Sequence, residues 1–212
     1  GAKNARVTAL AGFTTVREAG SGRDTAFSLR RGTAEGMVPG PRIVAAGPAL
    51  AIIGGHGDVN GFRSEVNELL DSGFTCTGAV ECAAKVRLAS QNGADVIKIT
   101  ATGGVLSQQG RGLEAHFTPA EMKAIADTAH SLGLKVMAHA HGARGIQQAV
   151  SEAMLRGLRR AGLSPARAET AARGFTNAPR IFDSGHASAG EALLAWRAGE
   201  MADAGADAAA ID

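Results

Sequence analysis

One lysine interrupts an otherwise apolar segment, residues 95–100, whose pattern predicts a strand buried on both sides. Side chains alternate along a strand, so Lys98 lies on the face opposite to Ile97 and Ile99. A buried ammonium group is costly unless it is paired or its pKa falls. Lys98 is therefore either a group with a chemical role or a lysine whose amine reaches the strand end or an acidic partner.

Two histidines, His139 and His141, alternate with alanine after a second apolar segment that begins at Lys135. On a strand both imidazoles would share one face, about 6 to 7 Å apart. That spacing would let one or both rings reach a single metal ion, and neutral imidazole is the commonest metal ligand. The alternative is a pair of hydrogen-bonded core histidines.

A third candidate is His56, which lies among three glycines in the segment GGHGD at residues 54–58. Loops at the carboxyl ends of parallel strands often carry functional sites, and this loop follows a strand predicted to end near Pro48. The alternative is an ordinary turn with an exposed histidine. His116, His130 and His186 have no comparable context, and His130, on a helix whose other face is apolar, is predicted to be structural or solvated.

Alternating strands and helices must position these side chains. The hydrophobic patterns predict strands at residues 14–18, 42–46, 95–100 and 135–141, and helices at 23–31, 80–91, 118–132 and from 145 to about 161. Thr118, Pro119 and Glu121 form a strong helix start, with a capping box. This order predicts an α/β fold with a parallel sheet. Further helices are expected at 164–173 and 191–197.

The composition excludes several classes of protein. With 212 residues and a net charge of +2, the chain lacks the basic excess of a nucleic-acid binder, and it has no apolar run that could cross a membrane. The first residues have no signal-peptide pattern; they read as part of a helix, so a signal peptide could lie upstream, although a cytoplasmic location is favoured. Cys76 and Cys82 are predicted to be free thiols.

Six motifs occur in an order that resembles the metal-dependent amidohydrolase superfamily. Within it the likeness is greatest to the prolidase-like branch of Xaa-Pro and Xaa-Arg dipeptidases and ochratoxin-type amidohydrolases, over residues 5 to 150. The motifs are GFTTVRE at residues 12–18, PGPR at 39–42, GGHGD at 54–58, GADVIKI at 93–99, ATGGVLS at 101–107 and AHAHG at 138–142.

The resemblance implies a (β/α)₈ barrel with a binuclear metal centre, usually zinc. It implies that Lys98 is a carboxylated lysine that bridges the two ions and that His139 is a second metal ligand. His141 would face the substrate, and His56 and Asp58 would line the mouth of the pocket. No residue of the chain is assigned as the catalytic proton acceptor, because the family's aspartate after strand eight has no counterpart here.

The chain departs from the family pattern at both ends of the barrel. The first-strand His-x-His would lie before Gly1, and about three strands are absent between residues 150 and 155, so the zinc centre would be incomplete. We therefore expect an incomplete TIM-like barrel of about strands two to five at residues 1–150. Residues 151–212 would hold C-terminal helices and a remnant of the family's C-terminal region. Asp183 and His186 are weak candidates to replace lost ligands.

Two functions follow as expectations. The first is metal-dependent hydrolysis of an amide or peptide C–N bond in a dipeptide or N-acyl amino acid. The second is a catalytically inactive remnant that acts as a binding or assembly module, since an open sheet has unpaired edges. The expected partners are a small molecule or dipeptide and possible further copies of the chain, without nucleic acid or membrane. A nucleotide-binding α/β domain is disfavoured, because no Gly-x-Gly-x-x-Gly opens a helix after the first strand.

Overall fold

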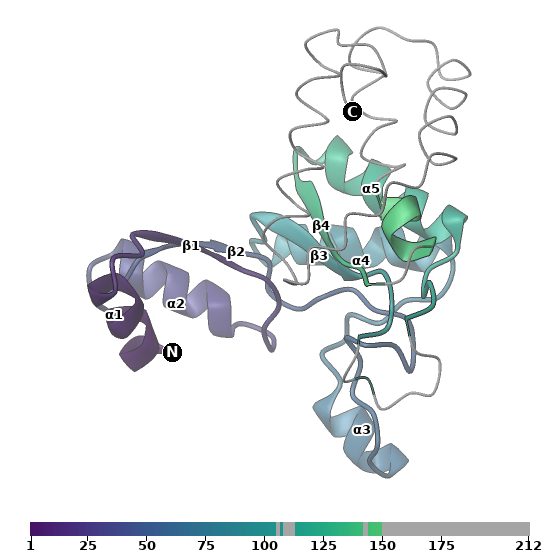
Figure 1. Cartoon of the computed structure of the whole chain (residues 1–212), viewed down its shortest axis with the longest axis horizontal. Coiled ribbons are helices and arrows are strands. Elements are labelled where there is room, and N and C mark those ends of the chain that lie inside the picture. The colour runs from purple at the N-terminus through teal and green to yellow at the C-terminus, as the bar shows by residue number, and fades with distance from the viewer. Residues whose placement is uncertain (105–106, 108–112, 142–143, 150–212) are drawn as a thin grey trace, which may run out of the picture. The chain divides into compact units, whose positions relative to one another are not determined.

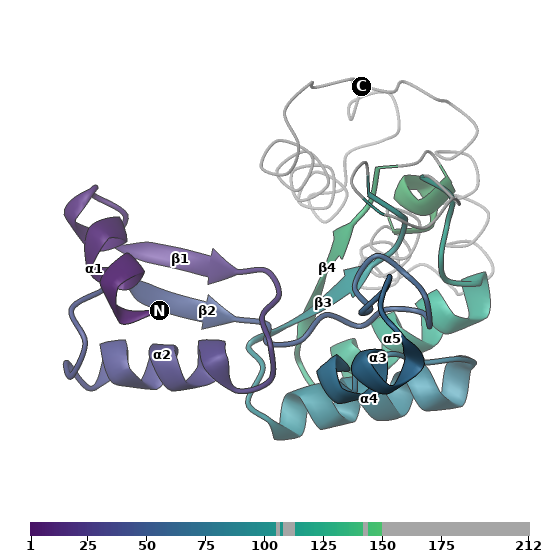
Figure 2. The same ribbon diagram turned by 90° about the horizontal axis from the view of Figure 1, so that it is seen from below.

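Helices and strands alternate along the residues that the computed structural model describes, 1–104, 107, 113–141 and 144–149. Helix α2 packs along the strands β1 and β2, and helices α4 and α5 lie beside β3 and β4 (Figures 1 and 2). The strands are β1 (Thr15–Glu18), β2 (Arg42–Ala45), β3 (Val96–Thr100) and β4 (Lys135–His139). The helices are α1 (Ala2–Leu10), α2 (Thr25–Ala34), α3 (Ser64–Leu70), α4 (Ala79–Gln91) and α5 (Pro119–Ser131).

The chain divides into two compact units, Gly1–Gly142 and Ala143–Asp212. In the second unit residues 144–149 are helical, in agreement with the start of the helix predicted from residue 145. The helices predicted beyond residue 150, together with Asp183 and His186, lie outside the described residues, and the predicted domain boundary at 150 stays a prediction. In the described part of the chain, no helix is both long and apolar enough to cross a membrane.

The four strands form two parallel pairs. Strand β1 pairs with β2 from Thr15↔Arg42 onward, and β3 pairs with β4 from Val96↔Lys135 to Thr100↔His139. Two contacts connect the first strand pair to the second. The Asp95 amide, before β3, donates to the Ala45 carbonyl at the end of β2 at 2.8 Å, and Leu50 forms a parallel bridge with Ile99. The predicted α/β class is confirmed, although the described strands do not close into a barrel.

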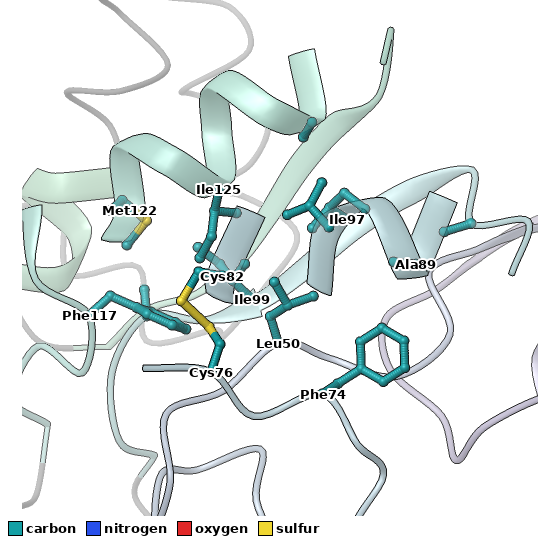
Figure 3. Packing of buried hydrophobic residues seen from close by; sticks show 14 residues of the cluster. Leu50, Phe74, Cys76, Cys82, Ala89, Ile97, Ile99, Phe117, Met122 and Ile125 are labelled. Carbon is teal, nitrogen blue, oxygen red and sulfur yellow. A yellow bond between two sulfur atoms is a disulfide. The ribbon is translucent and has the colours of Figure 1, made fainter. Parts of the chain in front are cut away.

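The main core lies between β3 and the helices α4 and α5 (Figure 3). Ile97 and Ile99 are 0% and 1% exposed, and they pack with Val86 of α4 and Ile125 of α5. Two helices therefore cover the isoleucine face of β3, as alternation along the strand requires. Lys98, on the opposite face, is left half-buried.

Helix α5 begins with the capping box that the sequence predicts. The Thr118 hydroxyl accepts from the Glu121 amide, and the Glu121 carboxylate accepts from the Thr118 amide at 2.8 Å. The same carboxylate also accepts from the amide of Gly78, the N-cap of α4, at 2.7 Å. Glu121 thus joins the starts of α4 and α5, which explains why it is buried.

The prediction of two free thiols is wrong, because Cys76 and Cys82 form a disulfide. Cys82 lies in α4, and Cys76 follows Thr75, which bridges Ala51. Both sulfur atoms belong to the main core, as Figure 3 shows. A spacing of six residues carries no pairing information; the pair forms because the loop before α4 turns back onto the first turns of that helix.

Three further features differ from the sequence predictions. Helix α2 continues past Gly32 to Ala34, and Gly32 packs closely against Val38, 3.3 Å from where a Cβ would lie. Helix α3 is not among the predicted helices: it spans only seven residues, and its apolar positions Val66, Leu69 and Leu70 lie at helical spacing but are exposed. Strand β4 is only partly buried because β3 is its sole neighbour among the described strands.

Replacing Glu121 by Gln should lower the free energy of unfolding at neutral pH by about 1 kcal/mol, because one capping acceptor and the charge are lost. Burial alone would raise the pKa of Glu121, but hydrogen bonds from Thr118 and Gly78 outweigh it and lower that pKa. The stabilisation is therefore complete above the ordinary carboxyl range and is lost as pH falls through the folded-state pKa. Urea unfolding of E121Q at several pH values tests this. The exposed Glu35→Gln is the control, and an equal loss at all pH values would contradict the assignment.

Replacing both cysteines by alanine should cost about 2 kcal/mol, because the disulfide closes a short loop in the unfolded chain. Urea unfolding of C76A/C82A with and without reductant measures this cost. Reductant should lower the unfolding midpoint of the wild-type protein and leave that of the double variant unchanged. Two titratable thiols in unreduced, denatured wild-type protein would rule out the bond.

Candidate functional site

The register of β3 with β4 places Lys98 and His139 on the same face of the sheet. Lys98 is paired with Met137, and Thr100 is paired with His139. Directly paired residues point to the same side of a sheet, and Lys98 and Thr100 share a face because they are two residues apart. The amine and the imidazole that the sequence singled out therefore lie on one side, opposite the helix-covered isoleucines.

The ring of His139 has one bonded and one unbonded nitrogen. The backbone carbonyl of Gly103 accepts a hydrogen bond from the ring. Nε2 is buried and has no hydrogen-bond partner in the described part of the chain, so the bond to Gly103 is made by Nδ1–H. This tautomer leaves a lone pair on Nε2, which is the arrangement of a metal-ligating histidine whose second nitrogen is held by a carbonyl.

Three of the predicted site histidines gather at this point. The rings of His56 and His139 stack with centroids 4.2 Å apart and planes 20° apart. His141 meets His139 edge-on at 4.7 Å, and its backbone amide donates to the Thr102 hydroxyl at 3.0 Å. His141 is exposed, whereas the other two rings are half-buried. The structure thus brings together residues 56, 139 and 141 from loops and strands that are far apart in sequence.

The glycines of residues 54–58 allow this loop to approach the strands closely. A Cβ at Gly57 would lie 3.1 Å from Thr100, and one at Gly55 would lie 3.1 Å from Nδ1 of His116. The loop also uses the Asp58 carboxylate, which accepts from the amides of Gly54 and Val59, both at 2.8 Å. Asp58 therefore closes its own loop, and its predicted place at the pocket mouth stays a prediction.

Burial and nearby basic groups favour the neutral form of His139 and His56. Burial, together with the nearby His56, His141 and Lys98, lowers the pKa of His139 to about 4, against the opposing effect of the Gly103 carbonyl. Burial and the same two neighbours, His141 and Lys98, also lower the pKa of His56. Neutral rings retain the lone pairs that metal binding or proton acceptance requires.

Lys98 itself is affected by burial and by one carboxylate. Burial lowers the pKa of its amine, and the charge of Glu18 opposes that shift. Glu18, at the end of β1, accepts from the backbone amides of Ala46 at 3.1 Å and Gly47 at 2.9 Å, and also from that of Gly20. This carboxylate is therefore held at the ends of β1 and β2, within electrostatic reach of the lysine.

Sequence reasoning missed two residues of the site. Glu18 is the last residue of a predicted strand. Its position at the carboxyl end of that strand is the sequence feature that could have identified it as a site residue. His116 has no comparable sequence context, but it lies near His56, and its Nδ1 is buried without a partner among the described residues. The bridge between Thr102 and Ala115 brings His116 close to the site. This is a tertiary contact that cannot be predicted from the spacing of residues in the sequence.

The donor set fits a metal ion in part. No group of three His, Cys, Asp or Glu side chains within the described residues is arranged to hold one. The stacked rings of His56 and His139 explain this, since face-to-face imidazoles do not direct their lone pairs at a common point. The free Nε2 of His139 and the half-buried amine of Lys98 are suitable ligands, but two donors are fewer than a binuclear centre needs.

Comparison with known proteins agrees with this geometry. The sequence model of the amidohydrolase family matches residues 2–173. The chain is 35% identical over 155 residues to an ochratoxinase of Aspergillus niger, a match that covers 66% of this chain and 31% of the relative. This chain thus spans about a third of the length of that protein.

Solved structures show the same likeness. A Xaa-Pro dipeptidase with bound methionine in the active site is 40% identical with a TM-score of 0.66, over 71% of this chain and 38% of that one. The structure of A. niger ochratoxinase is 28% identical with a TM-score of 0.64, over 71% and 37%. In each case the described fold corresponds to a part of a longer chain.

The pKa of His139 provides a direct test of the site's electrostatics. In an NMR titration of the metal-free protein this ring should protonate at about pH 4. Lys98→Met should raise that pKa toward the ordinary value of 6.5, because one nearby positive charge is removed. Lys135→Met is the matched control. Lys135 is exposed at the start of β4, the strand that carries His139, and its replacement should leave the pKa of His139 unchanged. Protonation of His139 at or above its ordinary value would contradict the arrangement.

Proposed function

Because the chain belongs to the amidohydrolase family, we propose that it serves in metal-dependent hydrolysis of an amide or peptide C–N bond in a dipeptide or N-acyl amino acid. The observation that carries the proposal is the placement of Lys98 and the unbonded Nε2 of His139 on one face of the β3–β4 pair. The names of the relatives, ochratoxinase and Xaa-Pro dipeptidase, support this substrate class.

In this proposal Lys98 and His139 hold the metal, and zinc is the expected ion. Lys98 would act as a carbamate, in which its neutral amine adds CO₂ and releases a proton. The lowered pKa of Lys98 favours the neutral amine that this addition needs. His139 would ligate through Nε2, since the Gly103 carbonyl holds its other nitrogen. When bound, the metal would supply hydroxide near neutral pH and polarise the scissile carbonyl.

The remaining predicted residues would contact the substrate. His141 is exposed beside His139, so its ring is available to a bound molecule. His56 stacks on the other side of the site and is held in a fixed orientation. Asp58 would act through the shape of its loop, because both of its oxygens are engaged by backbone amides. A base that accepts the proton of water is not assigned among the described residues.

The second candidate is an inactive binding or assembly module. It is favoured by the small donor set, in which no three His, Cys, Asp or Glu side chains of the described residues form a metal site. The two candidates differ in whether purified protein retains metal, so metal content separates them directly.

Metal analysis after zinc loading and dialysis is the test. If the chain is the hydrolase, it should retain zinc, up to the two ions of a binuclear centre, and should hydrolyse an Xaa-Pro dipeptide or an N-acyl amino acid. Lys98→Ala should lose both metal and activity, because it removes the bridging ligand. Lys135→Ala is the matched control, since this lysine is exposed at the start of β4.

Outcomes that contradict the proposal are equally definite. Retention of far less than one zinc per wild-type chain would leave the module as the function. Retained zinc and hydrolysis in Lys98→Ala would show that the metal is held elsewhere. The unfolding midpoints of both variants are measured alongside, so that a loss of metal is separated from a loss of fold.

A further inference from the structure

Ser107 connects the loop after β3 to His56. Its hydroxyl oxygen lies 2.8 Å from the backbone nitrogen of Gly104 and 2.7 Å from Nδ1 of His56. The Gly104 N–H can only donate, so the hydroxyl oxygen accepts that bond. With its oxygen accepting from Gly104, the Ser107 hydroxyl can direct its proton at Nδ1 of His56, which is then the unprotonated nitrogen of the ring.

The His56 ring also contacts His139 and the backbone at Gly104. On one side it stacks on His139 with centroids 4.2 Å apart. A Cβ added at Gly104 would lie 2.5 Å from Cε1 and 2.9 Å from Nδ1 of His56, so the ring lies directly against the glycine backbone. The ring thus cannot turn over easily, and its hydrogen-bond roles are set by Ser107.

The two stacked rings would then have opposite tautomers. In His139 the proton is on Nδ1, because the Gly103 carbonyl accepts it, and Nε2 has the lone pair. In His56 the lone pair of Nδ1 is used by Ser107, so the proton is on Nε2. Hydrogen-bond partners decide the tautomer of a neutral imidazole, and the loop after β3 provides a different partner for each ring.

We propose that Ser107 is a positioning residue that holds His56 in the Nε2–H tautomer, so that His56 presents a hydrogen-bond donor and not a metal-binding lone pair. The donor suits an oxygen atom of a ligand, such as a carboxylate or carbonyl oxygen. That ligand assignment rests on the proposed function, whereas the tautomer and the role of Ser107 rest on the hydrogen bonds alone. The site would thereby offer one lone pair and one N–H from two adjacent rings.

Nitrogen-15 NMR of the metal-free protein at about pH 8, where an ordinary imidazole is neutral, tests the tautomer. The signals of His56 are identified by their loss in His56→Gln. Nε2 should resonate as a protonated nitrogen, and Nδ1 as an unprotonated nitrogen that accepts a hydrogen bond. A proton on Nδ1 of His56 in the wild-type protein would overturn the proposal, and this measurement needs no Ser107 variant to fold.

Two variants test the role of Ser107. Ser107→Ala should shift the Nδ1 resonance of His56 to that of a nitrogen without a donor, and Ser107→Thr should restore it because the hydroxyl is kept. The Nε2 resonance of His139 should stay unchanged in both, which controls for a general disturbance of the loop. An unchanged Nδ1 resonance in Ser107→Ala would refute the positioning role.

Zinc binding separates this inference from the proposed function. If the protein retains zinc, His56→Gln should retain it as well, because His56 contributes no lone pair, whereas His139→Gln should lose at least half of it. Loss of zinc from a folded His56→Gln protein would overturn the donor role. A wild-type protein without zinc would refute the proposed function and leave the NMR result on Ser107 fully decisive.

Discussion

The site depends on how β3 divides its side chains between two faces. Ile97 and Ile99 are buried against α4 and α5, and this packing leaves Lys98 only the opposite face. The parallel register with β4 then brings His139 to the same face, through the pairing of Thr100 with His139. Hydrophobic burial on one side of the strand thus determines the chemistry on the other. A shift of one residue in this register would exchange the two faces and separate the lysine from the imidazole.

Burial and neighbouring basic groups favour the uncharged form of His139 and His56. Three imidazoles and an amine lie close together, and the structure places one carboxylate, that of Glu18, within reach of the lysine. Protonation of His139 would add a positive charge beside Lys98 in a partly buried position, so its pKa falls to about 4. Burial and the nearby basic groups together keep the ring neutral and so preserve the lone pair of Nε2.

Local signals predicted much of the fold and the first half of the site. The capping box of Thr118 and Glu121 and the alternation around Lys98 are encoded within a few residues, so their elements are observed where they were expected. The disulfide and the arrival of His116 depend on contacts between distant segments, which no spacing records. Helix α3 is only seven residues long, too short for the helical spacing of Val66, Leu69 and Leu70 to identify it.

The disulfide has a consequence for the order in which the protein matures. Only six positions separate Cys76 from Cys82, so their thiols can meet early, before the distant strands have paired. After folding, both residues are at most 1% exposed, which denies small thiols in solution a path to the sulfur atoms. Exchange would then need an opening of the first turns of α4. A disulfide that can form between residues close in sequence is afterwards protected from reduction by the core that packs around it.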